Sequence, residues 1–545
     1  MAEAANPTAS GGTTESGPSR SALVRSSAVV AVGTSLSRIT GLLRVVALLY
    51  ALGQTRLTDA FTIANTLPNL TYELLLGGIL SATLVPVFTE RTEEEDGGTS
   101  AVISVTAAAL VVVTAIGIIA APWVINIFAG FISNPEPGEV EAYRQVGTTL
   151  LRFLMPQVLF YGLITVITAL LHSRRSFAAP AYAPVFNNLV VSGLLFALPT
   201  VVGHSMKGEG ALFEAVTNGR VTLILGAGAT VGVAAMALSL LPSLARQSVP
   251  IRLNLDWRHP AVTTVLRLSG WTVGYVAANQ VALYIVLGLA TAQIGGDVTA
   301  YNVAFTFFQL PHGLFAVSIM TTFMPELTIA AQRQDAEAFR ERFNLGLRLM
   351  ALVILPASAG YTALAPQIVA LLPLGDTSAA TTAKVLAAFS VGLIGFSVYL
   401  YGLRAFYARK DTKRPFYLNL VENGLNVVLA IPLVALAGVA GLAGAYSLAY
   451  LIGGSLTLWT LSRRVGGLNL GEDAWPLLKM LAAAVACGVA AWLSAEMIGG
   501  TVLRQVVVAV PVGGAVYAIG LLLLGVEEVD SARQIVLGRF RSRRM

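Results

Sequence analysis

Residues 26–51 read SSAVVAVGTSLSRITGLLRVVALLYA, an apolar stretch long enough to cross a lipid bilayer as one helix, yet it contains Arg38 and Arg44. A lipid-facing arginine near the centre of a bilayer costs roughly 2.5–3.5 kcal/mol on insertion scales. Two arginines in one span therefore require an interior cavity, water or an anionic partner. We expect this chain to build a positively charged chamber inside the membrane.

The composition is that of a polytopic membrane protein. Of 545 residues, 55% are hydrophobic and 12% are charged, against about a quarter charged in soluble domains. Hydropathy, which averages +0.73, predicts an all-α fold with about fourteen transmembrane helices joined by short links. The lone Cys487 allows no intrachain disulfide, and the four histidines have no metal-ligand spacing. No glycine-rich phosphate loop indicates an ATPase.

Lysine and arginine are distributed unevenly between the predicted links. With a cytoplasmic N-terminus, 15 of them lie in or beside the even-numbered links and 6 in or beside the odd-numbered links. Cytoplasmic loops carry the excess of these residues, so both termini are expected in the cytoplasm. The pI of about 9.4 is then explained by basic cytoplasmic loops that lie beside anionic lipid headgroups. No nucleic-acid partner is expected.

The chain repeats itself at an offset of 235 residues. The run YGLITVITALLHSRRSFAAPAYAPVFNNLV from Tyr161 aligns without a gap with FSVYLYGLRAFYARKDTKRPFYLNLVENGL from Phe396, pairing Asn188 with Asn423. Six spans separate the copies, so two six-helix lobes should be related by a parallel pseudo-twofold axis along the membrane normal, with substrate bound between them. The predicted units are a disordered cytoplasmic tail (1–21), an N-lobe (22–245), a C-lobe (246–465), an extra helix pair (466–527) and a basic cytoplasmic tail (528–545).

Three motifs resemble those of a known family. SRITGLLR (37–44), TDAFTIANTLPNL (58–70) and GGILSATLVPVFTE (77–90) resemble the MurJ/MviN lipid II flippases of the multidrug/oligosaccharidyl-lipid/polysaccharide exporter superfamily. The resemblance implies a lipid flippase and not an enzyme. Its cargo would be undecaprenyl-diphosphate-linked disaccharide-pentapeptide, moved from the inner to the outer leaflet of the bacterial cytoplasmic membrane by alternating access. Lipid II, the lipid bilayer and the cell-wall synthesis machinery are the implied partners.

Some positions depart from the family pattern. Tyr72 stands where members often have arginine, and Phe305, Thr306 and Gln309 stand where members often have Asp-Arg and Glu. The seventh span, predicted over residues 261–293, lacks the acidic residue that binds sodium in some members. Sodium coupling therefore does not follow from the resemblance.

Two arginines and several polar residues are the candidate substrate-binding groups. Arginine matches phosphate oxygens with paired, planar donors and stays charged when desolvated. We therefore expect Arg38, near the midplane, and Arg44, nearer the outer exit, to bind the diphosphate. Asp59, Asn65, Tyr72 and Gln309 are the further candidates. Each also has a structural interpretation, namely a helix N-cap for Asp59, satisfaction of backbone opened by prolines for Asn65 and Gln309, and packing for Tyr72.

Glu73, Glu422 and Asn426 are the candidate gating or coupling residues. Glu73 matches Arg38 in depth, so it either forms a static ion pair or acts as a gate that substrate phosphate opens. Glu422 and Asn426 share a helix face, and a carboxylate with amide oxygens can bind sodium or carry a proton. Hydrogen bonding between helices is the alternative. We expect no cofactor and no structural metal, with sodium, protons or the membrane potential as the driving force.

Three other functions fit parts of the sequence. An exporter of another lipid-linked glycan or of drugs is the nearest alternative, although a cationic-drug exporter should have an acidic cavity. A glycosyltransferase would need a catalytic carboxylate in a large outer loop, and the longest outer links (132–142 and 203–218) are short. A non-transporting scaffold for cell-wall assembly would not need a duplicated, charge-lined core.

Overall fold

The computed structural model describes residues 20–74, 84, 88, 98–174, 176–208, 210–247, 253–468 and 470–526. Within those residues every regular element is a helix. Only helices and closed barrels satisfy all backbone polar groups inside lipid, and the long apolar runs of this chain lack the alternation of barrel strands. The all-α, multi-pass class predicted from the sequence is confirmed.

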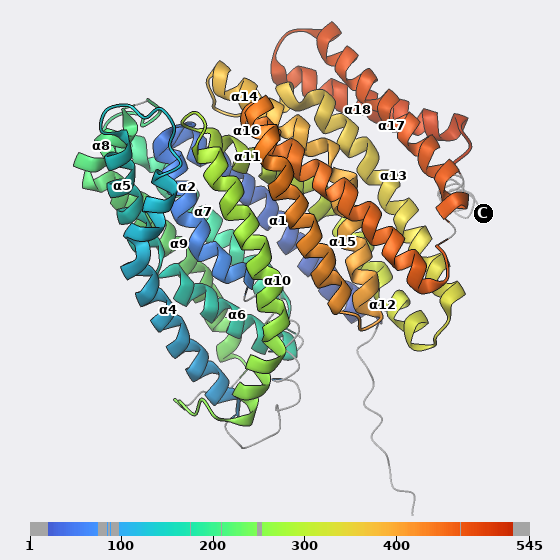
Figure 1. Cartoon of the computed structure of the whole chain (residues 1–545), viewed down its shortest axis with the longest axis horizontal. Helices are drawn as coiled ribbons and strands as arrows, with labels where there is room; N and C mark the ends of the chain where they lie inside the picture. Colours follow the sequence, from blue (N-terminus) through green and yellow to red (C-terminus); the bar gives the residue numbers. More distant parts are fainter. Residues whose placement is uncertain are drawn as a thin grey trace, which may run out of the picture.

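The first group of helices lies on the left of Figure 1. It comprises α1 (Arg20–Leu52), α2 (Arg56–Leu74), α4 (Gly98–Ala129), α5 (Glu139–Leu154), α6 (Gln157–Ser173), α7 (Ala178–Val202), α8 (Ala211–Thr217) and α9 (Gly219–Ala245). Helix α7 packs against both α1 and α9, and α2 packs against α5.

Most of the second group lies on the right of Figure 1, while α10 runs beside the first group. It comprises α10 (Pro260–Thr291), α11 (Asp297–Pro311), the π-helical turn η2 (His312–Ala316), α12 (Val317–Gln332), α13 (Ala336–Val369), α14 (Asp376–Val391), α15 (Leu393–Ala408) and α16 (Lys413–Val465). Helix α10 packs against α16 and also against α4 of the first group. The last two helices, α17 (Leu470–Ile498) and α18 (Val502–Leu523), pair with each other on the surface of α13.

Helix α16 consists of two helical halves that meet at a sharp kink at Ala437 and Gly438, where the chain reverses direction. Gly438 has φ 56° and ψ −142°, a conformation that favours glycine because a side chain would clash with the backbone. A Cβ atom built on Gly453 would lie 3.2 Å from Cγ of Glu422, although a straight helix would separate these residues by about 46 Å. The two halves of α16 therefore pack side by side.

Among the described residues, eleven helices are long and apolar enough to span a membrane, and the pair α14–α15, bent by 45°, adds a twelfth. The folded-back α16 counts once in that total. Part of the predicted second span (58–89) and both predicted tails lie outside the described residues. The number fourteen, like the domain boundaries, stays a prediction.

Candidate functional site

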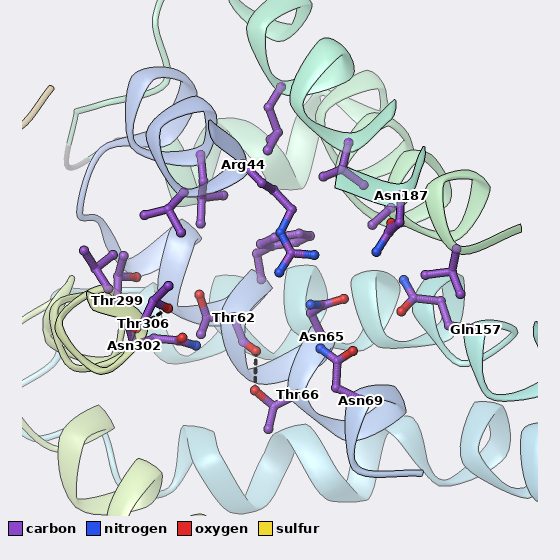
Figure 2. Close-up of a pocket in the computed structure, with 18 of the residues that line it drawn as sticks. Arg44, Thr62, Asn65, Thr66, Asn69, Gln157, Asn187, Thr299, Asn302 and Thr306 are labelled. Carbon is purple, nitrogen blue, oxygen red and sulfur yellow. Dashed lines mark hydrogen bonds between the residues drawn. The ribbon is translucent and has the colours of Figure 1, made fainter. Parts of the chain in front are cut away.

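A polar chamber lies where α1, α2, α6, α7 and α9 meet α11, and Figure 2 shows the guanidinium of Arg44 pointing into it. The cavity has a volume of about 150 Å³. We call it the Arg44 chamber. Its polar lining comprises Arg44, Thr62, Asn65, Thr66, Asn69, Gln157, Tyr161, Asn187, Thr299, Asn302 and Thr306. Arg44 and Asn65, two of the predicted substrate-binding residues, thus line one cavity.

The Arg44 chamber is cationic. Arg44 is the one charged residue among its described lining side chains, and no carboxylate of the described chain lies within ion-pair distance of it. The side-chain amide of Gln157 and Oδ1 of Asn187 are buried without a hydrogen-bond partner among the described residues. Unpaired buried polar atoms cost free energy that a polar ligand can recover. The chamber therefore suits an anionic ligand that also carries hydroxyl or amide groups.

Asp59 joins the two groups of helices near the end of the bundle where α1 meets α2, which we call the α1–α2 end. Its carboxylate is fully buried and accepts hydrogen bonds from the backbone amide of Gly296 (2.7 Å) and from the amide and hydroxyl of Thr299 (2.9 and 2.7 Å). Asp59 thus caps the N-terminus of α11, where a negative charge is favourable. Asp59 is therefore a helix cap, but it caps α11 and not its own helix α2. The partner, Gly296, is 237 residues away in the sequence.

Two neighbours of Asp59 close the same end. Nε of Arg56 pairs with Glu139 at 2.8 Å, and its two terminal nitrogens donate to the carbonyls of Thr291 (2.9 Å) and Gln293 (3.1 Å) after α10. The Gln54 side chain donates to the Thr382 hydroxyl of α14 at 2.5 Å. We refer to Gln54, Arg56 and Asp59 as the α2 latch. Arg56 is not among the site residues predicted from the sequence, because its partners are carbonyl groups that no motif marks.

A second group of cations lies outside the Arg44 chamber. Arg38 is exposed, and a Cβ atom on Gly313 would lie 2.9 Å from its Nη2 atom, so Arg38 rests against the π-helical turn η2. The imidazole of His312 interacts electrostatically with both Arg38 and Arg404 of α15, and its Nδ1 atom lies 3.0 Å from the Ser397 hydroxyl. We call Arg38 and Arg404, together with the imidazole of His312 that interacts with both, the inner cation cluster.

Sequence reasoning did not single out Arg404. The signal was present, because an isolated arginine three residues before the end of a predicted span (381–407) is costly unless it faces a cavity or partner. The loop cations that follow from Arg409 mask this signal, because they make Arg404 look like part of the same charged link. Gln309, a predicted substrate contact, lies on α11 outside the lining of the Arg44 chamber. The side chains of Tyr72 and Glu73 lie outside the described residues.

Glu422 and Asn426 are buried in the second group of helices, away from the Arg44 chamber. Glu422 interacts with the hydroxyl of Tyr450. Oε2 of Glu422 and Oδ1 of Asn426 have no hydrogen-bond partner among the described residues. Two acceptor oxygens on one helix face are therefore available to a proton or a cation.

The repeated asparagines join equivalent helices. Asn188 of α7 donates to the Ser37 carbonyl and the Thr40 hydroxyl of α1, both at 3.1 Å. Asn423 of α16 donates to Oδ1 of Asn279 on α10 at 2.8 Å. In each half the fifth predicted span is bound to the first, so these two aligned residues both join helices.

Comparison with known proteins gives one family. The family model described as "Lipid II flippase MurJ" matches residues 48–509. A protein of Burkholderia cenocepacia named "Lipid II flippase MurJ" is 28% identical over 433 residues, covering 76% of this chain and 80% of the relative. The "Probable lipid II flippase MurJ" of Vibrio cholerae is 25% identical over 539 residues, covering 93% and 97%.

Solved structures of low identity share the fold. A structure titled "Lipid II flippase MurJ, inward closed conformation" superposes with a TM-score of 0.73 at 20% identity, covering 90% of this chain and 98% of the other. An inward-facing multidrug resistance MATE family transporter of the MOP superfamily gives a TM-score of 0.62 at 13% identity, covering 81% and 99%. The same helical architecture is thus found in transporters with different cargo.

Proposed function

This chain belongs to the MurJ family of lipid II flippases, and from that premise we propose that it moves lipid II from the inner to the outer leaflet by alternating access through a cationic cavity. It is a multi-pass membrane protein of a transporter fold and not an enzyme. The bacterial cytoplasmic membrane, with both termini in the cytoplasm, follows from the family and from the lysine and arginine distribution. The α1–α2 end is then the outer end.

The Arg44 chamber carries the proposal. Its one charge is positive, it is formed by α1 and α2 of one group together with α11 of the other, and polar side chains surround it. A diphosphate needs a cation that stays charged away from water, and arginine meets this need. The asparagine, glutamine and threonine side chains supply hydrogen bonds for a sugar. A cationic drug would be repelled by the same site.

The size of the chamber and the α2 latch support an alternating mechanism. A cavity of about 150 Å³ is smaller than the roughly 300–1,000 Å³ of sites for drug-sized ligands, and a disaccharide-pentapeptide is larger still. Lipid II therefore requires the two groups of helices to separate. The Asp59 contacts with α11 hold the outer end closed in this structure. Release of the α2 latch is the step that would open the chamber outward.

The inner cation cluster provides an entry site. Arg38 and Arg44 are six positions apart on α1, which is about 9 Å along the helix, with Arg38 nearer the cytoplasmic end. Arg404 approaches from α15 of the opposite group. Substrate phosphate can bind between Arg38 and Arg404 first and reach Arg44 later. A ligand shared by the two groups would draw them together, which couples binding to closure.

Depletion of this protein is expected to trap lipid II in the cytoplasmic leaflet, because its diphosphate headgroup cannot cross the bilayer without a polar path. The measurement is leaflet-resolved labelling of lipid II in depleted cells lacking any second flippase. Re-expression of the wild-type chain is the control. An unchanged outer-leaflet pool would refute lipid II as the cargo, and accumulation of a different lipid-linked glycan would identify the alternative substrate.

Glu422 with Asn426 is our proposed coupling site. Their unpaired oxygens lie inside the second group of helices, so binding a proton or sodium there can alter helix packing without contact with the substrate. The interaction of Glu422 with Tyr450 links the two halves of α16. This proposal leaves Asn423 with a structural role.

Glu422→Gln is expected to abolish the dependence of transport on the ion gradient while lipid II binding persists, because glutamine keeps the size but neither ionises nor binds a cation strongly. Flipping in proteoliposomes with imposed sodium or pH gradients measures this. Glu141→Gln, the same substitution at an exposed residue of α5 outside the proposed site, is the control. Wild-type dependence on both gradients in Glu422→Gln would return Glu422 to a structural role.

A further inference from the structure

A basic cavity lies at the opposite end of the bundle from the α2 latch, in the turn between α15 and α16. Its volume is about 410 Å³. Its charged lining is Arg409, Lys410, Asp411, Lys413, Arg414 and Arg464. Because α16 folds back at Gly438, its last turn returns to its first turn and brings Arg464 beside residues some fifty positions earlier in the chain.

The positive charges of this cavity exceed the negative charges. Asp411, the one acid in its described lining, forms an ion pair with the Arg414 side chain and accepts a hydrogen bond from the Arg414 amide at 3.2 Å. Partial burial raises the pKa of Asp411, but the hydrogen bonds from Arg414 outweigh this effect and lower the pKa below its ordinary value. Asp411 therefore stays ionised and its charge is balanced by Arg414.

Four further cations of the described lining form no ion pair, although Arg464 interacts electrostatically with Asp411. Within the described chain, no ion pair is formed by Arg409, Lys410, Lys413 or Arg464. Arg409 stacks its guanidinium 5.5 Å from the ring centroid of Phe339, which fixes its direction. Lys410 has φ 57°, the tight-turn conformation that folds the loop over the cavity. Like charges held together in this way are stabilised by a bound anion.

The equivalent turn of the N-lobe provides an internal comparison. The repeat aligns Arg174 with Arg409, and the Arg174 guanidinium donates to the Gln247 carbonyl at 2.8 Å. The positions equivalent to Asp411, Lys413 and Arg414 are occupied by Ser176, Ala178 and Ala179. Both turns carry a pair of basic residues, which is enough to set the orientation of the helices in the membrane. That orientation therefore does not require Lys413 and Arg414, the additional cations of the second turn.

We propose that this cavity binds the phosphate of an anionic phospholipid headgroup from the adjacent leaflet. The turn follows directly on the last residue of α15, which places the cations at headgroup depth, where basic pockets between helices bind anionic lipid. Guanidinium and ammonium groups from both ends of α16 converge on one phosphate, so the lipid would tie the two halves of α16 together. The site is separate from the Arg44 chamber and does not depend on lipid II as cargo.

Arg464 and Arg463 make a matched pair for the test. Both lie in the last turn of α16, but only Arg464 lines the cavity, while Arg463 stacks over Trp459 at 4.0 Å. Native mass spectrometry of the full chain with phosphatidylglycerol should show at least a fivefold loss of bound lipid in Arg464→Gln and in Lys413→Gln. Arg463→Gln should retain it. Thermal unfolding in phosphatidylcholine should be alike in all three variants, which shows that the fold is intact.

The same experiment separates the sources of phosphate. Phosphatidylglycerol should bind and raise the melting temperature more than phosphatidylcholine does, and inorganic phosphate should not displace it. Equal lipid retention by Arg464→Gln and wild type overturns the site. Displacement of the lipid by millimolar inorganic phosphate overturns the lipid as its ligand.

Discussion

Arg44→Ala is expected to reduce lipid II flipping roughly 10- to 150-fold, the equivalent of one charge-assisted hydrogen bond worth about 1.5–3 kcal/mol. The arginine is the one described charge in the lining of its chamber, so nothing else there can replace its contact with the diphosphate. Insertion into the membrane should be unaffected or easier, since alanine costs less than arginine in a span. Flipping in proteoliposomes, normalised to inserted protein, measures the effect.

Two variants serve as controls for this experiment: a lysine substitution at Arg44 and an alanine substitution at an exposed arginine. Arg44→Lys should recover only part of the activity, because an ammonium cannot make the paired contact of a guanidinium. Arg152→Ala removes an exposed arginine of α5 outside the chamber lining and should be near wild type. Arg38→Ala and Arg404→Ala should each weaken lipid II binding if the inner cation cluster is the entry site. Normal flipping by Arg44→Ala would remove this residue from substrate binding.

Asp59→Asn is expected to open the outer end of the bundle. The amide retains one acceptor oxygen for Thr299 but directs N–H groups toward the amide of Gly296, so at least one charge-assisted hydrogen bond worth about 1.5–3 kcal/mol is lost. A shift of that size changes the ratio of closed to open molecules roughly 10- to 150-fold. The variant should therefore populate the outward-open state and lose net transport.

Spin labels report this opening directly. Ser133 and Thr377 are exposed near the α1–α2 end on opposite groups of helices, and the buried Cys487 can be replaced by serine before labelling. The distance between the two labels should increase in Asp59→Asn. Asp335→Asn, the same substitution at the N-cap of α13, removes no contact between α2 and α11 and should leave the distance unchanged. An unaltered distance in Asp59→Asn would show that other contacts keep the outer end closed.

Local sequence patterns were sufficient to predict that the protein is a helical, multi-pass membrane protein and that it contains an internal repeat. Helical spans follow from apolar length, because lipid leaves the backbone no other partner. The pairing of Asn188 with Asn423 was visible as an alignment, and both bind the first span of their own half. Arg44 could be named as a chamber residue because a charge inside an apolar span has few alternatives.

Contacts between distant segments could not be read from the same patterns. Asp59 and Arg56 bind backbone groups more than 230 residues away, and backbone amides and carbonyls leave no mark in a sequence. Arg404 acquires its role because α15 and Arg38 of α1 both approach η2, and Arg464 acquires its role from the reversal of α16. The sequence by itself determined a multi-pass helical protein with buried positive charge, since hydrophobicity and charge are properties of single segments. Only the tertiary structure decided which charges meet, which remain unpaired and which end of the bundle is closed, because these depend on how segments far apart in the chain pack together.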